Sequence, residues 1–227
     1  MEFTGYIQLL QGEYKERFDA YRALIIEYNE RYNLTTILDE KDMFYKHFLD
    51  SVVGEKAFKK GGKIIEIGSG AGFPSIPLKI LRDDLSFTLV ESVGKKCEFL
   101  HALVDKLGLT NMNIYSKRAE ELARDENHRE RYDAATARAV ARMNTLSEYC
   151  LPFVKVGGVF VAYKSGDTAE IDEAKTAYKL LGGRLRSAEK YELPEAYGER
   201  TLAVVEKVSS TPKKYPRGQG KERKSPL

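Results

Sequence analysis

The sequence predicts an α/β fold, in which a mostly parallel, doubly wound sheet follows a group of N-terminal helices. Strand-like and helical segments alternate after residue 62, a glycine-rich loop follows the first strand, and no helix separates the last two strands. The 227 residues are enough for one sizeable core, and a composition of 42% apolar and 31% charged residues is typical of a globular domain.

Two amphipathic helices are expected before the sheet. From residue 13 to residue 32, aromatic and aliphatic side chains recur at steps of three and four, which places them on one helical face. A second helical pattern covers residues 40–53, with Met43, Phe44, His47 and Phe48 on one face. We therefore expect His47 to be a structural residue of a helix face and not a catalyst.

Seven strands are expected, and the last two form a hairpin. The strand-like segments cover residues 63–67, 86–91, 113–116, 133–137, 158–164, 184–193 and 200–208, and the helices between them cover residues 74–81, 95–107, 144–154 and 171–181. The last two strands should pair antiparallel at one edge. Dinucleotide-binding folds are usually wholly parallel, whereas an added antiparallel hairpin is typical of S-adenosylmethionine-dependent methyltransferases.

The loop after the first strand indicates what such a sheet binds at the carboxyl ends of its strands. Glycines there, among them Gly68 and Gly70, allow a sharp turn and a close approach to a ligand. Phe73 stands where a dinucleotide fingerprint needs its third glycine, and Glu66 would repel a pyrophosphate but suits an ammonium group. Glu91 ends the second strand, where a carboxylate can accept both ribose hydroxyls. Together these features favour S-adenosylmethionine over a nicotinamide cofactor.

The region after the fourth strand lacks the motifs of familiar base methylation. It reads ARAVARM instead of an NPPY-type segment, and Cys97 and Cys150 both fall in helical patterns. A nucleophile with a free lone pair, such as guanine N7, needs neither motif, because orientation alone can bring it to the methyl group. The cysteines and the three scattered histidines predict no metal site.

The same residues resemble the bacterial RsmG (GidB) family. The resemblance rests on IIEIGSGAGFPSIPLKI, LVESVGKKCEFL, RAEEL, ATARAVARMNTLSEYCLPFVKVGG and TPKKYPRGQGKERKSPL, with NLTTI and HFLDSV in the N-terminal region, and so covers the chain in order. It implies a class I, Rossmann-like methyltransferase that methylates N7 of one guanine in 16S ribosomal RNA near the decoding site. Ser75, Glu91 and YKS at residues 163–165 depart from the usual family pattern.

The resemblance also implies site residues. Those for the cofactor are Gly68, Phe73, Ala119, Glu120 and Arg138, to which the physical argument above adds Gly70 and Glu91. Arg138 is also the candidate catalytic residue, which we expect to join the cofactor and RNA sites by holding a phosphate or the guanine edge. The alternative for Arg138 is a structural ion pair with a carboxylate such as Glu120.

A basic C-terminal segment suggests a polyanionic partner. Residues 211–227 carry six cations and one carboxylate, a net charge of +5 within a total of +3, so the remaining chain carries −2. Its many prolines and glycines and few apolar side chains predict a segment that cannot fold alone. The candidate RNA-binding residues are Arg142, Lys164, Arg200, Lys213, Lys214 and Arg217. A merely solubilising segment is the alternative.

These patterns give an expected organisation and setting. Residues 1–60 form an N-terminal helical cap, residues 61–208 the methyltransferase domain, and residues 209–227 a flexible, RNA-contacting tail. The expected partner is 16S ribosomal RNA or a small-subunit particle, with no membrane partner, and the chain is expected to be a cytoplasmic monomer. The alternative function is a non-catalytic, RNA-binding ribosome assembly factor.

Overall fold

The computed structural model describes residues 3–166 and 168–227 and contains one seven-stranded sheet. The strand order is β3-β2-β1-β4-β5-β7-β6; all neighbours are parallel except β7, which runs antiparallel to both β5 and β6. The strands are β1 (Lys63–Ile67), β2 (Ser86–Glu91), β3 (Met112–Ser116), β4 (Tyr132–Arg138), β5 (Val154–Ser165), β6 (Gly183–Glu192) and β7 (Glu199–Lys207). The predicted seven-stranded sheet with a terminal antiparallel hairpin is confirmed.

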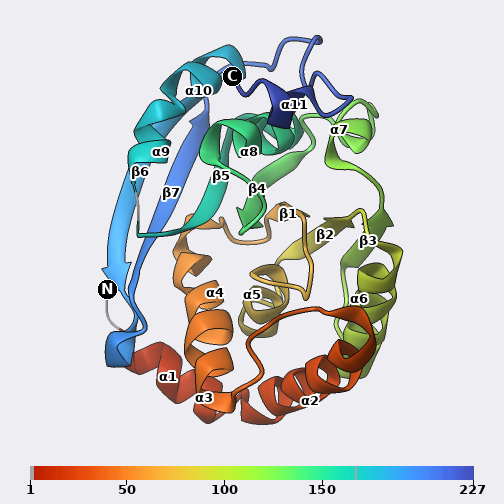
Figure 1. The fold of residues 1–227 in the computed structure, drawn as a ribbon, viewed down its shortest axis with the longest axis vertical. Coiled ribbons are helices and arrows are strands. Elements are labelled where there is room, and N and C mark those ends of the chain that lie inside the picture. The colour runs from red at the N-terminus through yellow and green to blue at the C-terminus, as the bar shows by residue number, and fades with distance from the viewer. Residues whose placement is uncertain (1–2, 167) are drawn as a thin grey trace.

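Helices cover both faces of this sheet, as Figure 1 shows. On one face lie α1 (Thr4–Gln11), α2 (Lys15–Tyr32), α3 (Glu40–Met43), the π-helical segment η1 (Phe44–Leu49), α4 (Asp50–Val52), the 3₁₀ turn η2 (Val53–Ala57), α5 (Ser75–Leu81) and α6 (Gly94–Leu107). On the other lie α7 (Ala119–Leu122), α8 (Met143–Cys150), η3 (Leu151–Phe153), α9 (Ala169–Glu173), α10 (Lys175–Leu180) and α11 (Lys221–Lys224). A further 3₁₀ turn, η4 (Pro194–Ala196), joins β6 to β7.

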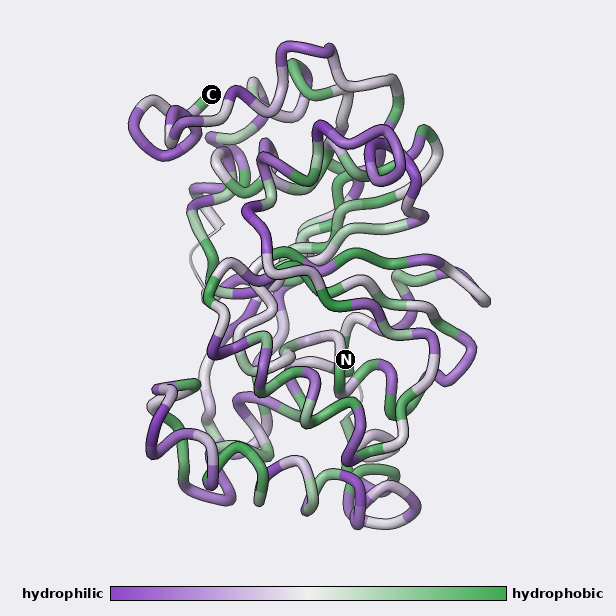
Figure 2. The backbone as a smooth tube through the Cα atoms, turned by 90° about the vertical axis from the view of Figure 1, so that its right-hand side faces the viewer, coloured by the Kyte–Doolittle hydropathy of each residue, from purple (hydrophilic) through white to green (hydrophobic). Residues whose placement is uncertain are grey.

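Two hydrophobic cores hold the layers together, one on each face of the sheet. Adjacent strand residues point to opposite faces, so Ile64 packs in the core that contains α2 and α6, while Ile65 packs in the core that contains α8 and α10. The hydropathy colouring of Figure 2 shows the apolar strands between these layers. No helix among the described residues has the length and apolar character needed to cross a membrane.

Helix boundaries differ from the sequence expectations where tertiary contacts or a proline intervene. The helix expected at residues 144–154 is α-helical only to Cys150, and Pro152 lies in the 3₁₀ turn that follows. The helix expected at residues 171–181 breaks at Ala174 into α9 and α10. The helical pattern at residues 40–53 is real, but its central turn is π-helical, and that turn carries His47.

The basic C-terminal segment is folded onto the body of the protein, whereas the sequence predicted a flexible tail. Tyr215 is 5% exposed and Glu222 is fully buried. In Figure 1 this segment and α11 lie beside α8 and α7. The composition argument remains valid, because such a segment cannot form its own core, but it does not prevent the segment from docking on a core built by other elements.

Candidate active site

The site lies at the carboxyl ends of β1, β2 and β4, around the glycine loop. Gly68 and Gly70 adopt positive φ angles of 70° and 54°, which favour glycine. A Cβ atom on Gly68 would lie only 2.6 Å from a methyl group of Val140, so the close contact between loop and chain requires glycine there. The glycines therefore let the backbone form the wall of a cavity.

Two cavities meet at this loop. The larger, of about 500 Å³, is lined by Gly68, Gly70 and Phe73 and by Arg138 on β4, together with Thr35 and His47 from the N-terminal region. The smaller, of about 80 Å³, is lined by Ala119 and Glu120 at the start of α7, with Val140, Tyr149 and Arg223 around them. Gly68 and Glu91 line both cavities. Each of the seven predicted cofactor residues thus lines at least one of these two cavities.

Glu91 sits at the junction of the two cavities with a fixed carboxylate. One oxygen accepts a hydrogen bond from the backbone N–H of Gly70 at 3.0 Å, and the other accepts from the N–H of Val93 at 2.9 Å. Each carboxylate oxygen has two lone pairs, so one acceptor position on each remains for a ligand. Two adjacent acceptors on a rigid group suit a vicinal diol such as a ribose.

The aromatic ring of Phe73 lines the larger cavity and packs against other side chains. This ring stacks on His47 with centroids 4.5 Å apart and on Tyr21 with centroids 5.3 Å apart. The guanidinium carbon of Arg138 lies 4.9 Å from the ring centroid, within the range of a cation–π contact. Phe73 thus joins the glycine loop to the N-terminal helices and supports the arginine.

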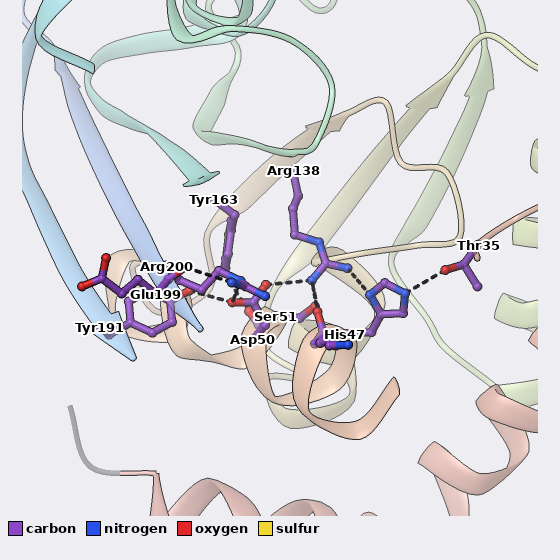
Figure 3. A network of polar contacts seen from close by, with 10 residues as sticks. Thr35, His47, Asp50, Ser51, Arg138, Tyr163, Tyr191, Glu199 and Arg200 are labelled. Atoms are coloured by element: carbon purple, nitrogen blue, oxygen red, sulfur yellow. Dashed lines mark hydrogen bonds and ion pairs between the residues drawn. The ribbon is translucent and has the colours of Figure 1, made fainter. Parts of the chain in front are cut away.

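Arg138 crosses from the end of β4 to the N-terminal helices (Figure 3). Its Nη1 donates to Asp50 Oδ2 at 3.0 Å and to the Lys46 carbonyl at 3.2 Å, and its side chain is only 12% exposed. The sequence considered Glu120 as the ion-pair partner of Arg138, but the partner is Asp50. Its Nε and one Nη2 hydrogen remain for a ligand in the cavity.

His47 is part of this network and lines the larger cavity, whereas the sequence predicted only a structural residue of a helix face. Arginine only donates hydrogen bonds, so Arg138 Nη2, 3.2 Å from His47 Nδ1, places the ring proton on Nε2, which donates to Thr35 Oγ1 at 2.9 Å. Burial and the charge of Arg138 lower the pKa of His47 to about 3, so the ring is neutral. Thr35 also accepts from the N–H of Ile37, which leaves its own proton free to donate. Thr35 lies in the NLTTI motif and His47 in the HFLDSV motif, so the family resemblance of these two motifs is the sequence feature that could have indicated them.

Asp50 anchors the other side of the network. Its Oδ1 accepts from the Tyr191 hydroxyl at 2.8 Å, and Arg200 Nε lies 3.9 Å from the same oxygen. Asp50 is 3% exposed, so a buried carboxylate joins the N-terminal helices, β4 and the β6–β7 hairpin. These three regions are far apart in the sequence, and they share one polar centre.

Glu66 lies behind the glycine loop and does not line either cavity. Its carboxyl group is fully buried, and neither oxygen has a hydrogen-bond partner among the described residues. Burial raises its pKa to about 8, opposed by the nearby Ser75 hydroxyl and the charge of Arg138. The expected contact between Glu66 and a ligand ammonium group therefore remains a proposal.

The six candidate RNA-binding residues are dispersed. Arg200 and Lys164 line the larger cavity; Lys164 pairs with Glu170 at 2.9 Å, and Arg142 pairs on the surface with Glu173 at 2.6 Å. Lys213 and Lys214 are exposed. Arg217 differs from the other five, because its guanidinium is engaged by the buried Glu148. The structure thus leaves the two lysines free of ion pairs with described residues and holds Arg217 in a structural contact.

No group of three or more His, Cys, Asp or Glu residues in the described part of the chain is arranged to hold a metal ion. Cys97 and Cys150 are buried free thiols. Burial raises the pKa of both, which disfavours the reactive thiolate.

Comparison with known sequences relates the chain to one family. Residues 14–198 match the family model described as GidB, rRNA small subunit methyltransferase G. The ribosomal RNA small subunit methyltransferase G of Lactobacillus acidophilus is 46% identical over 224 residues, covering 96% of this chain and 93% of the relative. The protein of the same name from Brevibacillus brevis is also 46% identical, over 221 residues, with the same coverage.

Solved structures share the fold at low identity. An O-methyltransferase from Bacillus cereus, solved in complex with SAH, is 16% identical with a TM-score of 0.56 and covers 82% of this chain and 91% of its own. A precorrin-6y C5,15-methyltransferase from Geobacter metallireducens is 13% identical with a TM-score of 0.53, covering 69% and 87%. At this identity the likeness concerns the class I methyltransferase architecture alone.

Proposed function

The chain belongs to the rRNA small subunit methyltransferase G family, and we propose that it transfers a methyl group from S-adenosylmethionine to N7 of one guanine in 16S ribosomal RNA. The observation that carries the proposal is the pair of cavities that share Gly68 and Glu91, with the cationic side chain of Arg138 lining the larger one. One cavity suits each half of the cofactor.

The residues present fit this cofactor. The smaller cavity has the small Ala119 and the aromatic Tyr149 for a flat adenine ring, and Glu91 offers two free acceptor positions at the junction for the ribose. The buried, unpartnered carboxyl of Glu66 borders neither cavity, so its proposed contact with the ammonium group of the cofactor is indirect. When bound, S-adenosylmethionine supplies an electrophilic methyl group on its sulfonium.

The larger cavity suits a nucleophile that needs no base. Guanine N7 carries a lone pair and loses no proton when it is methylated, and the neutral His47 has its Nδ1 lone pair occupied by Arg138. The protein therefore contributes orientation, and the free N–H groups of Arg138 are donors for guanine O6 or an adjacent phosphate. The Asp50 carboxylate offsets the charge of Arg138, which limits repulsion of the guanine ring as it becomes positive.

The RNA is expected to approach the open side of this cavity. Arg200 and Lys164 line it, and Arg142, Lys213 and Lys214 add exposed cations for backbone phosphates. We propose 16S ribosomal RNA or a small-subunit particle as the partner, action in the cytoplasm, where ribosomes assemble, and a monomeric state. We also propose the residue ranges 1–60, 61–208 and 209–227 as functional units, the last docked on the second.

Mass mapping of 16S rRNA tests the function. A strain lacking the gene should lose one methyl group from a guanine of the small-subunit RNA. Restoring the wild-type gene should restore the modification, whereas Glu91→Ala should not. An unchanged modification pattern in the deletion strain would favour the non-catalytic assembly factor instead.

A further inference from the structure

The C-terminal segment, residues 211–227, lies beyond the part of the chain that the family model matches, which ends at residue 198. Nevertheless this segment packs against the rest of the protein. Thr211 and Tyr215 are buried, and the guanidinium of Arg129 donates to the carbonyl oxygens of both at 2.8 and 2.9 Å. The Pro212 carbonyl also accepts from Arg129, at 3.2 Å, so one arginine holds three residues of the segment before it reaches α8.

The middle of the segment is fixed to α8. Glu148 on α8 is fully buried, and it accepts from the backbone N–H of Arg217 at 2.8 Å, from its Nε at 3.0 Å and from its Nη2 at 2.7 Å. A bidentate arginine–carboxylate pair that also accepts a backbone N–H leaves little rotational freedom. The path of the chain after Arg217 is thereby set.

The last turn of the segment is anchored as well. The side chain of Glu222 is buried and accepts from the N–H of Gly218, while its backbone carbonyl accepts from Thr145 Oγ1 of α8 at 2.8 Å. Residue 222 thus faces the body, and residue 223, its neighbour on the α11 turn, is held at the edge of the smaller cavity.

Arg223 borders the smaller cavity beside the glycine loop. Its Nη2 donates to the Val140 carbonyl at 3.4 Å, and it also interacts with the Tyr149 hydroxyl. Val140 is the residue that packs against Gly68. Among the described residues that line this cavity, Arg223 is the one that comes from the C-terminal segment.

We propose that Arg223 is a cofactor-binding residue, and that the C-terminal segment serves to hold its guanidinium as the outer wall of the adenosyl subsite. The proposal rests on the proposed function, because it assigns the smaller cavity to the adenine of S-adenosylmethionine. Adenine presents a flat π-face and ring-nitrogen acceptors, and a planar guanidinium can stack on the first and donate to the second. The exposure of Arg223 leaves its remaining N–H groups free of the body.

Calorimetric titration with S-adenosylhomocysteine tests this assignment on the full-length protein. Arg223→Ala should weaken binding about tenfold, the size of one lost charge-assisted contact. Arg223→Gln, which keeps a planar polar group without the charge, should lie between the wild type and Arg223→Ala. The matched control is Lys224→Ala, which removes an exposed cation of the same helix that does not line the cavity and should change the affinity less than twofold.

Two further measurements separate binding from folding and from the proposed function. The thermal midpoint of Arg223→Ala should equal that of the wild type, and titration with adenosine alone should show the same loss as the full ligand. Equal S-adenosylhomocysteine affinities for Arg223→Ala and the wild type would overturn the assignment of Arg223. A wild-type protein that binds no S-adenosylhomocysteine would instead overturn the proposed function.

Discussion

Removing the carboxylate of Asp50 should destabilise the protein severely, because Arg138 would keep its charge without its partner. The side chains of Asp50 and Arg138 are 5% and 12% exposed, so the pair is largely shielded from water. Breaking a buried ion pair by removing one partner costs about 3 to 5 kcal/mol. Arg138 would keep its bond to the Lys46 carbonyl and its contact with Phe73, so we expect Asp50→Ala to lose about 3 kcal/mol, at the lower end of that range.

Urea unfolding followed by circular dichroism measures this loss in the free energy of unfolding. The matched control is Asp42→Ala, which removes an aspartate from a half-exposed i,i+4 pair with Lys46 on the same stretch of helix. Ion pairs that solvent reaches contribute little, so the control should unfold much closer to the wild type than Asp50→Ala does. Equal unfolding free energies for Asp50→Ala and Asp42→Ala would refute the view that the Arg138–Asp50 pair is a buried structural centre.

Three further predictions concern pH and salt. The pKa of His47 is about 3 in the folded protein and about 6.5 in the unfolded one, so the unfolded state binds the proton first as pH falls. The free energy of unfolding should therefore fall by about 2 kcal/mol as pH drops from above 7 to 5. His47→Gln should remove this loss in urea titrations, and an unchanged pH dependence in the variant would contradict the assignment to His47. The pKa of Glu66 is raised to about 8, so the stability that the neutral carboxyl contributes below pH 4.5 should be lost as pH rises to 8. Glu66→Gln should therefore be more stable than the wild type at pH 9 but not at pH 4. An equal difference in unfolding free energy at the two pH values would argue against a buried, titrating carboxyl. Lys213→Ala/Lys214→Ala should reduce the slope of log RNA affinity against log salt by about 1.4, at about 0.7 per phosphate contact, without changing S-adenosylhomocysteine affinity; an unaltered slope would show that these lysines do not meet RNA.

The sequence by itself determined the sheet and the cofactor loop. Strand and helix periodicities are local properties of the chain, and the observed bounds of β1 (Lys63–Ile67) and β2 (Ser86–Glu91) match those predicted. The glycine loop was equally predictable, because glycine adopts a positive φ angle most readily and leaves room for Val140 to pack against Gly68. The antiparallel hairpin followed from the missing helix between two strands.

The tertiary structure alone decided the polar centre and the place of the C-terminal segment. Arg138 meets His47 and Asp50 across about ninety residues, a distance at which no periodicity specifies a contact, so His47 looked like an ordinary helix-face residue. The segment looked flexible because composition reports whether a stretch can build its own core. It does not report whether a buried carboxylate elsewhere, here Glu148, needs the cation that the segment carries. A buried charge requires a partner, and only the packed fold shows which one is within reach.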